Sequence, residues 1–244
     1  MYKQITIAID DGHGVETAGK RTPLFANGKF MHENEFNNAV AQLVKINLER
    51  CGFKTIMVAP SDKDIPLAER TAAANSAKAD FYISIHANAM TGSWGEASGI
   101  ETYHYPGSTK GQAAAEIIHK QLIKGTPLKD RCVKSAKFYV LKYTNMPAVL
   151  VECGFMDNLK EATLLLSGAY RKECADEISK GICEYFKVAW VEEKLETDVK
   201  QAIEILEQKG FINKPDYWLS CVGKVRYLDN LLIKIAEEMN GGRE

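Results

Sequence analysis

Short runs of apolar, β-type residues alternate with longer stretches of helical periodicity over the first 190 residues. The runs with strand composition are residues 5–10, 53–58, 81–85, 137–141 and 148–152. The stretches with helical spacing are residues 36–51, 67–77, 109–124 and 170–187. Because the strand-like runs are nearly continuous in apolar residues, they predict strands that are buried on both faces. The expected fold is α/β, a mostly parallel twisted sheet with helices on both faces.

A sixth run, residues 100–105, alternates between apolar and polar side chains and predicts an edge strand. After residue 190 the composition changes, and two amphipathic stripes follow at 195–206 and 228–239, separated by a presumed turn around Pro215. These stripes predict a small C-terminal helical hairpin. We therefore expect two domains, residues 1–190 and residues 195–240.

Charge and hydropathy exclude several classes of protein. The formal net charge is −1, which gives no basic field for nucleic acid or an anionic membrane, so neither is expected as a partner. The N-terminus, "MYKQITIAIDDGHG", begins directly with a strand-like run, and no charged segment leads into a long apolar stretch. We expect synthesis in the cytoplasm without a secretory signal peptide.

Three polar residues follow strand-like runs. His13 comes after the first run, His86 ends "ISIH", and Glu152 closes "AVLVE". Each could be an ordinary, hydrogen-bonded residue at a strand end. Because the carboxyl ends of parallel strands meet at one edge of a sheet, however, we expect the three to converge there. Two imidazoles and a carboxylate in one place suit a zinc ion.

A further ligand for such a site is expected from a loop over the same edge. The segment "MHENEF" supplies His32, Glu33 and Glu35 where the first helix should begin. Carboxylates in the first turn of a helix also have a structural role, since they interact favourably with the helix dipole. Spacing alone does not choose among these three residues.

Several motifs, taken together and in order, resemble the zinc-dependent N-acetylmuramoyl-L-alanine amidases of the amidase_3 type. They are "DDGHG", "ENEFN", "LAERTAAAN", "SIHANA", "GIETYHY", "FYVLKYTNMPAVLVECGFMDN" and "ISKGICEYF". The resemblance spans about residues 4–188. One departure is the long segment between the first two motifs, "GVETAGKRTPLFANGKFM", which contains Lys20 and is expected to form a rim over the site.

The resemblance implies a function and assigns roles to residues. It implies one zinc ion per chain, held by His13, Glu33 and His86, with Glu152 as the catalytic general base. The implied substrate is bacterial peptidoglycan, and the implied reaction is hydrolysis of the amide between N-acetylmuramic acid and L-alanine. Residues 1–190 would then be the catalytic domain. The alternatives are a wall-binding module without catalysis and a zinc peptidase acting on the stem peptide.

The role of the C-terminal hairpin is left open by the sequence. Docking on the first domain, wall targeting and self-association through the helices are all compatible with its apolar faces. For a wall hydrolase without a signal peptide, we expect action on the wall after release through a holin or on lysis. Arg70, in the motif "LAER", is equally compatible with a structural ion pair and with substrate contact.

Overall fold

The computed structural model describes residues 4–192, 195–221, 228, 232–233 and 235–236. The chain divides into two compact units, Met1–Val191 and Glu192–Glu244. Each unit has a hydrophobic core of its own.

The first unit is built on a sheet of six strands in the order β2-β1-β3-β6-β4-β5. The strands are β1 Thr6–Asp10, β2 Lys54–Met57, β3 Phe81–Asn88, β4 Ile100–His104, β5 Asp130–Ser135 and β6 Ala148–Phe155. All neighbouring pairs are parallel except β4 with β6. The predicted α/β fold with a mostly parallel sheet is confirmed.

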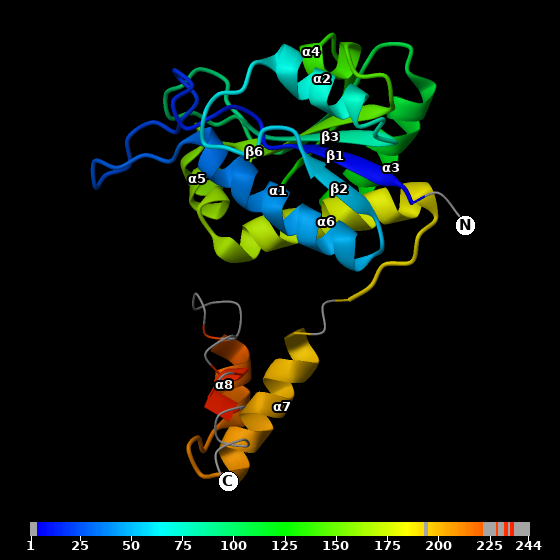
Figure 1. The fold of residues 1–244 in the computed structure, drawn as a ribbon. Coiled ribbons are helices and arrows are strands. Elements are labelled where there is room, and N and C mark those ends of the chain that lie inside the picture. The colour runs from blue at the N-terminus through cyan, green and yellow to red at the C-terminus, as the bar shows by residue number, and fades with distance from the viewer. Residues whose placement is uncertain (1–3, 193–194, 222–227, 229–231, 234, 237–244) are drawn as a thin grey trace. The chain divides into compact units, whose positions relative to one another are not determined.

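Helices cover both faces of this sheet (Figure 1). They are α1 Glu33–Arg50, α2 Leu67–Ser76, α3 Thr109–Gly125, α4 Tyr139–Lys142, α5 Leu159–Leu165 and α6 Gly168–Phe186. Helices α2 and α4 lie on one face, and α1 and α6 lie on the other. Successive strand residues therefore enter different cores: Val149 and Val151 pack in the larger cluster, whereas Leu150 packs with residues of α2 and α4. Burial on both faces explains the continuous apolar runs.

Two strand predictions are wrong. Residues 137–141 form no strand; residues 139–142 are the short helix α4. Strand β6 pairs with β3 on one side and with β4 on the other. Residues 137–141, which precede β6, therefore find no free edge of β6 with which to pair. Residues 100–104 do form a strand, but β4 is not at the edge, because β5 pairs with its other side. The edge strand β5, "DRCVKS", was missed because it carries few apolar residues.

The second unit contains α7 Leu195–Gln208 and α8 Pro215–Cys221. Val199, Ile203 and Leu206 of α7 are buried in its core. The predicted turn lies before Pro215, since residues 209–213 are turn, bend and irregular backbone. A helix begins at Pro215 itself, because proline suits a first helical position, where its missing N–H is not needed. Much of the second predicted stripe lies outside the described residues, although Leu232 and Ala236 are helical and buried.

No helix among the residues described is both long and apolar enough to span a lipid bilayer.

Candidate metal centre and active site

The carboxyl ends of β1, β3 and β6 and the first turn of α1 bring four of the predicted residues to one edge of the sheet. His13 lies in the loop after β1, Glu33 is the first residue of α1, and His86 lies near the end of β3. Glu152, on β6, is paired directly with His86. From β1 the chain adds β2 on one side of the sheet and then β3 on the other, so the strand order changes direction between β1 and β3. Such a point is the usual ligand-binding position in open α/β sheets.

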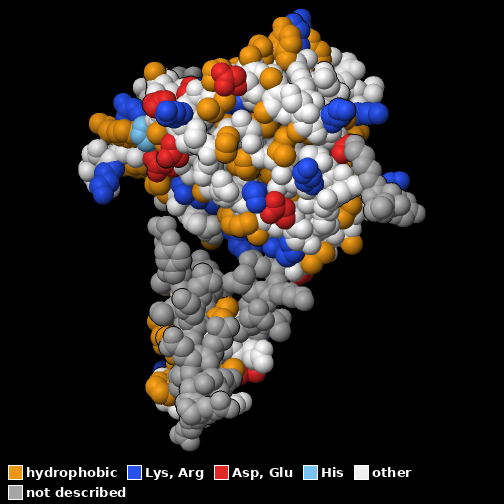
Figure 2. Space-filling model, viewed as in Figure 1, with side chains coloured by type: hydrophobic (Ala, Val, Ile, Leu, Met, Phe, Trp, Pro, Cys, Tyr) orange, Lys and Arg blue, Asp and Glu red, His pale blue; other side chains and the backbone are white. Residues whose placement is uncertain are grey.

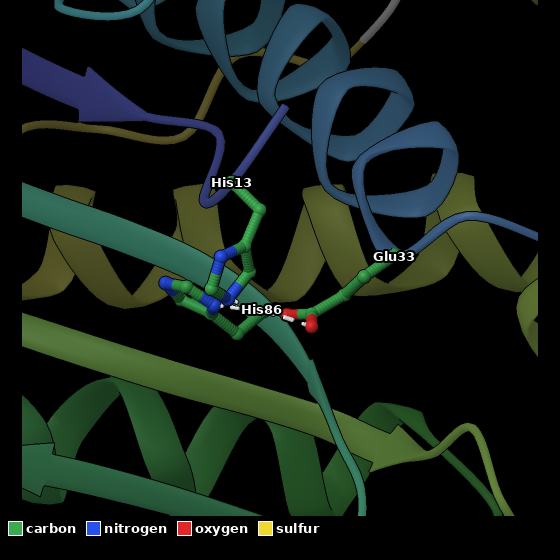
Figure 3. A group of neighbouring side chains, drawn as sticks. All are labelled: His13, Glu33 and His86. Atoms are coloured by element: carbon green, nitrogen blue, oxygen red, sulfur yellow. Dashed lines mark hydrogen bonds and ion pairs between the residues drawn. The ribbon is translucent and has the colours of Figure 1, made fainter. Parts of the chain in front are cut away.

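His13, Glu33 and His86 form a compact group, called here the His–Glu–His cluster. Their potential ligand atoms all lie within 4.8 Å of one another, and Figure 3 shows the three side chains converging. Nδ1 of His86 is 2.9 Å from Oε1 of Glu33, and Nε2 of His13 is 3.5 Å from Oε2. Glu33 is almost completely buried, with 1% of its surface exposed.

The loop that carries His13 is held tightly against the cluster. His13 has a φ of 62°, a left-handed backbone that is uncommon for a residue other than glycine. A Cβ at Gly12 would lie only 2.3 Å from Cε1 of His86, so only glycine fits there. Two amides from the first turn of α1 fix this loop: Asn34 donates to the carbonyls of residues 11 and 13, and Asn37 donates to that of residue 12.

A chain of buried hydrogen bonds orients the His86 ring and fixes the backbone at His13. The Ser84 hydroxyl donates to Oδ2 of Asp10 at 2.6 Å, which leaves its oxygen to accept from Nε2 of His86 at 3.1 Å. Nδ1 of His86 is therefore the nitrogen that faces the cluster. Arg70 donates to Oδ1 of Asp10 at 2.7 Å and to the carbonyl of His13 at 3.0 Å. Arg70 thus has a structural partner and also positions the His13 loop.

Burial acts to lower the pKa of both histidines, but their net pKa shifts are opposite. Burial lowers the pKa of His13 to about 4, against the opposing effect of Glu33, so its imidazole is neutral at pH 7. Burial also acts to lower the pKa of His86, but its hydrogen bond to Glu33 and the charge of that carboxylate raise the pKa overall.

The two carboxyl groups also differ. Burial acts to raise the pKa of Glu33, but His86, His13 and Lys20 together hold it below its ordinary value. Burial raises the pKa of Glu152 to about 8, assisted by the negative charge of Glu33 and opposed by His86. One carboxyl group is therefore held ionised, while the other is poised to exchange a proton near neutral pH.

The cluster fits a divalent cation on the chemistry of its donors. Oε2 of Glu33 and Oε2 of Glu152 are buried and accept no hydrogen bond from the described residues. A buried carboxylate oxygen without a partner is costly, and a cation held by Glu33 and the two histidines would remove that cost for Oε2 of Glu33. The neutral imidazole of His13 is the form that binds metals.

The two histidines of the cluster line a pocket of about 260 Å³, together with Lys20, Phe138, Tyr139 and Glu152. Nζ of Lys20, from the long segment before Glu33, lies 3.7 Å from Oε2 of Glu33. Phe138 and Tyr139 are partly exposed, and Figure 2 shows hydrophobic side chains gathered over α2 and α4. The pocket is therefore lined by both charged and aromatic side chains, as ligand sites commonly are.

The other residues considered from the sequence lie away from the cluster. His32 precedes α1, and its ring meets that of Phe30 edge to face. Glu35 accepts a hydrogen bond from the backbone N–H of His32 at 2.9 Å, in a capping box. Of His32, Glu33 and Glu35, the structure thus places only Glu33 beside His13 and His86. Sequence reasoning missed Asp10, at the end of β1, and Ser84, in the middle of β3.

Comparison with known proteins gives one family match. Residues 7–184 match the family Amidase_3, described as N-acetylmuramoyl-L-alanine amidase. The chain is 37% identical over 187 residues to the N-acetylmuramoyl-L-alanine amidase LytC of Bacillus subtilis, in an alignment covering 75% of this chain and 36% of LytC. It is 34% identical over 183 residues to an endolysin of Bacillus phage SPP1, covering 72% of this chain and 64% of the endolysin.

A solved structure shares the fold. The catalytic domain of CwlV, an N-acetylmuramoyl-L-alanine amidase from Bacillus (Paenibacillus) polymyxa, superimposes with a TM-score of 0.68 at 32% identity. The superposition covers 76% of this chain and all of that domain. The similarity therefore lies in the first unit.

Proposed function

The chain belongs to the Amidase_3 family of N-acetylmuramoyl-L-alanine amidases, and from that membership we propose that it is a zinc-dependent peptidoglycan hydrolase. It hydrolyses the amide between the lactyl group of N-acetylmuramic acid and L-alanine. The observation that carries this proposal is that two members of the His–Glu–His cluster, His13 and His86, line one pocket with Glu152, while Glu33 lies directly behind them.

His13, Glu33 and His86 would hold one zinc ion per chain, because zinc in catalytic sites typically has three protein ligands and an open position. When bound, zinc lowers the pKa of a coordinated water to about 7 and polarises a carbonyl oxygen. Ser84 and Arg70 would act behind the ligands. Through the hydrogen bonds described above, they keep the His86 ring and the His13 loop in their positions.

Glu152 is the proposed general base and acid. Its carboxylate takes a proton from the attacking water, whose oxygen bonds to the amide carbon. The same proton then passes to the nitrogen of L-alanine as the C–N bond breaks, leaving a lactyl carboxylate and a free amine. A raised pKa supports this role, because a group with a pKa near the working pH both accepts and returns a proton efficiently.

Mass analysis of digested peptidoglycan tests the proposal. Purified wall material treated with the protein should release stem peptides with a free N-terminal L-alanine, leaving glycan strands with free lactyl carboxylates. Binding to the wall without new amines would favour a binding module. New amines within the stem peptide, with the lactyl amide intact, would show a peptidase instead.

We also propose that the second unit targets the enzyme to the wall or mediates self-association. Tyr217 and Trp218, whose rings meet edge to face at 5.7 Å, give α8 an aromatic surface on which Tyr217 is 59% exposed.

The similarity to a phage endolysin supports action on the wall after release from a producing cell.

A further inference from the structure

A second charged group lies one strand away from Glu152. Glu101, on β4, is the direct cross-strand partner of Glu152 and is buried. Its Oε1 accepts from Nε of Arg131 at 2.6 Å and from Nζ of Lys134 at 2.5 Å. Because directly opposed residues share a face of the sheet, this group lies on the same face as the catalytic pocket.

Glu101 has more partners than one carboxylate needs. Its Oε2 accepts from the hydroxyl of Tyr103 at 2.5 Å and from the amide of Asn88 at 3.0 Å. Counted over these three side chains alone, the two cations exceed the carboxylate by one positive charge, and Arg131 also interacts with the carboxyl group of Glu161. The side chains of Arg131 and Lys134 are 28% and 38% exposed. A guanidinium has five N–H donors and an ammonium has three, so both retain donors for a second acceptor.

An irregularity in β5 creates this arrangement. In a regular strand, residues three apart point to opposite faces of the sheet, and Arg131 and Lys134 would not meet. The register between β4 and β5 shifts between Ile100 and Thr102, and Cys132 has a φ of 70°. The extra residue turns both cations onto one face. Backbone in this region is costly for a residue other than glycine and tends to persist at functional sites.

The spacing suits a peptide held over the catalytic residues. Arg131 and Lys134 are on β5, two strands from Glu152, but their charged ends bind Glu101 on the intervening strand β4. Because neighbouring strands are about 4.8 Å apart, these charged ends lie roughly one strand spacing beyond Glu152. In a peptidoglycan stem, the second residue is a glutamate joined onward through its side-chain carboxyl, which leaves its α-carboxylate free. An extended chain advances about 3.5 Å per residue, so this carboxylate lies about 7 Å from the amide to be cleaved.

We propose that Arg131 and Lys134 form a subsite for the free α-carboxylate of the second stem-peptide residue. The subsite makes the enzyme selective for stems in which that carboxylate is not amidated, through charge-assisted hydrogen bonds. This inference rests on the proposed amidase function. A purely structural ion pair, fastening the edge strand, would give no such selectivity.

A pair of substrates that differ at one group tests the subsite. They are N-acetylmuramoyl-L-alanyl-D-glutamate and its α-amide, and the measured quantity is the ratio of their kcat/KM values. The intact protein should prefer the carboxylate by about tenfold, the usual size of a hydrogen bond to a charged group at a partly exposed site. The preference should appear mainly in KM.

Lys134→Met should reduce the preference toward one, whereas Lys134→Arg, which keeps the charge, should retain it. Lys124→Met is the matched control, since Lys124 is exposed on α3, and it should leave the ratio unchanged. Lys134→Gln replaces Lys134→Met if the latter has a lowered melting temperature.

The outcomes separate the two proposals. If the intact protein cleaves neither lactyl amide nor wall material, the amidase function itself is refuted. If it cleaves both substrates equally well, or if the neutral variants keep the preference for the carboxylate, the subsite is refuted while the amidase function stands.

Discussion

Replacing Gly12 by alanine should misplace His86 while leaving the rest of the fold intact. The new Cβ would lie 2.3 Å from Cε1 of the His86 ring and 2.6 Å from both ring nitrogens, whereas ordinary contacts begin at 3.4 Å. The ring must therefore move by about 1 Å or the loop must shift by the same amount. Gly12 does not have a positive φ, so the backbone itself accepts alanine.

The size of the effect follows from what holds the ring. His86 is fixed by Ser84 on one nitrogen and by Glu33 on the other, and a shift of that size disrupts both hydrogen bonds. Disturbed orientation of a metal-binding histidine typically costs about 10–100-fold in metal affinity. A misplacement of about 1 Å can cost about 10²-fold in rate. The overpacking should also lower the free energy of unfolding by about 1–3 kcal/mol.

The assay is a zinc titration of chelator-treated Gly12→Ala by calorimetry, with wall hydrolysis and the melting temperature measured on the same samples. Gly168→Ala is the matched control, because a Cβ there would meet nothing within 4 Å. If Gly12→Ala binds zinc and hydrolyses walls like the unmodified protein, His86 is not a ligand held in the position described. If Gly168→Ala loses as much zinc affinity and hydrolysis as Gly12→Ala does, the effect of the Gly12 substitution is not steric.

Four further predictions follow from the structure. Glu152→Gln should retain zinc and lose about 10²–10⁴-fold in hydrolysis rate; near-normal lysis by a zinc-loaded variant would assign the base elsewhere. Chelation should abolish hydrolysis, and zinc at about one per chain should restore it; full activity in protein shown by metal analysis to be metal-free would rule the cofactor out. Burial acts to raise the pKa of Glu101, but Lys134, Tyr103 and Arg131 lower it overall from 4.5 to about 2. Its ionised form therefore stabilises the fold fully above pH 4.5, and that stability is lost as the pH falls toward 2. The free energy of unfolding, measured across this pH range, should change less with pH for Glu101→Gln than for the unmodified protein. The same pH dependence in both proteins would contradict the assignment. A chain ending at Val191 should bind zinc and cleave soluble muropeptides but act poorly on intact walls. If this shortened chain and the full chain lyse intact cells equally well, the second unit has no targeting role.

The parts of the fold that sequence could predict are those with buried surfaces on both sides. Strands β1, β3 and β6 lie inside the sheet and carry continuous apolar runs, so their existence follows from composition. The edge strand β5 has one open side and a polar sequence, and therefore gives no such signal. Helix α4 has four residues, too few for a helical period to be recognised.

Within the candidate site, the limits of sequence reasoning have a similar physical cause. His13, His86 and Glu152 are predictable as a group because each follows a strand of one parallel set. The choice between Glu33 and Glu35 depends on how α1 begins. Glu35 turns back to cap the backbone at His32, and a histidine at that position is not the usual signature of a capping box.

The supporting contacts are harder still to predict. Asp10 and Ser84 are 74 residues apart, and Asp10 and Arg70 are 60 apart. No local pattern connects them, because a hydrogen bond between neighbouring strands depends on strand order and register. Resemblance to a family indicates which residues are candidate metal ligands. Only the folded sheet shows which hydrogen bonds keep those candidate ligands in position.

The reversed direction of β4 links the catalytic pocket to the proposed carboxylate subsite. Because β4 runs antiparallel to β6 and β5 follows it in parallel, the beginnings of β4 and β5 lie at the same edge as the ends of β1, β3 and β6. Glu33 and Glu152 make the β1–β6 side of this edge suitable for a cation, whereas Arg131 and Lys134 make the β5 side suitable for an anion. With its amide carbonyl at the first position and its carboxylate at the proposed second position, a substrate would bind in one direction only. The orientation of the stem peptide would thus be set by the order and direction of the strands.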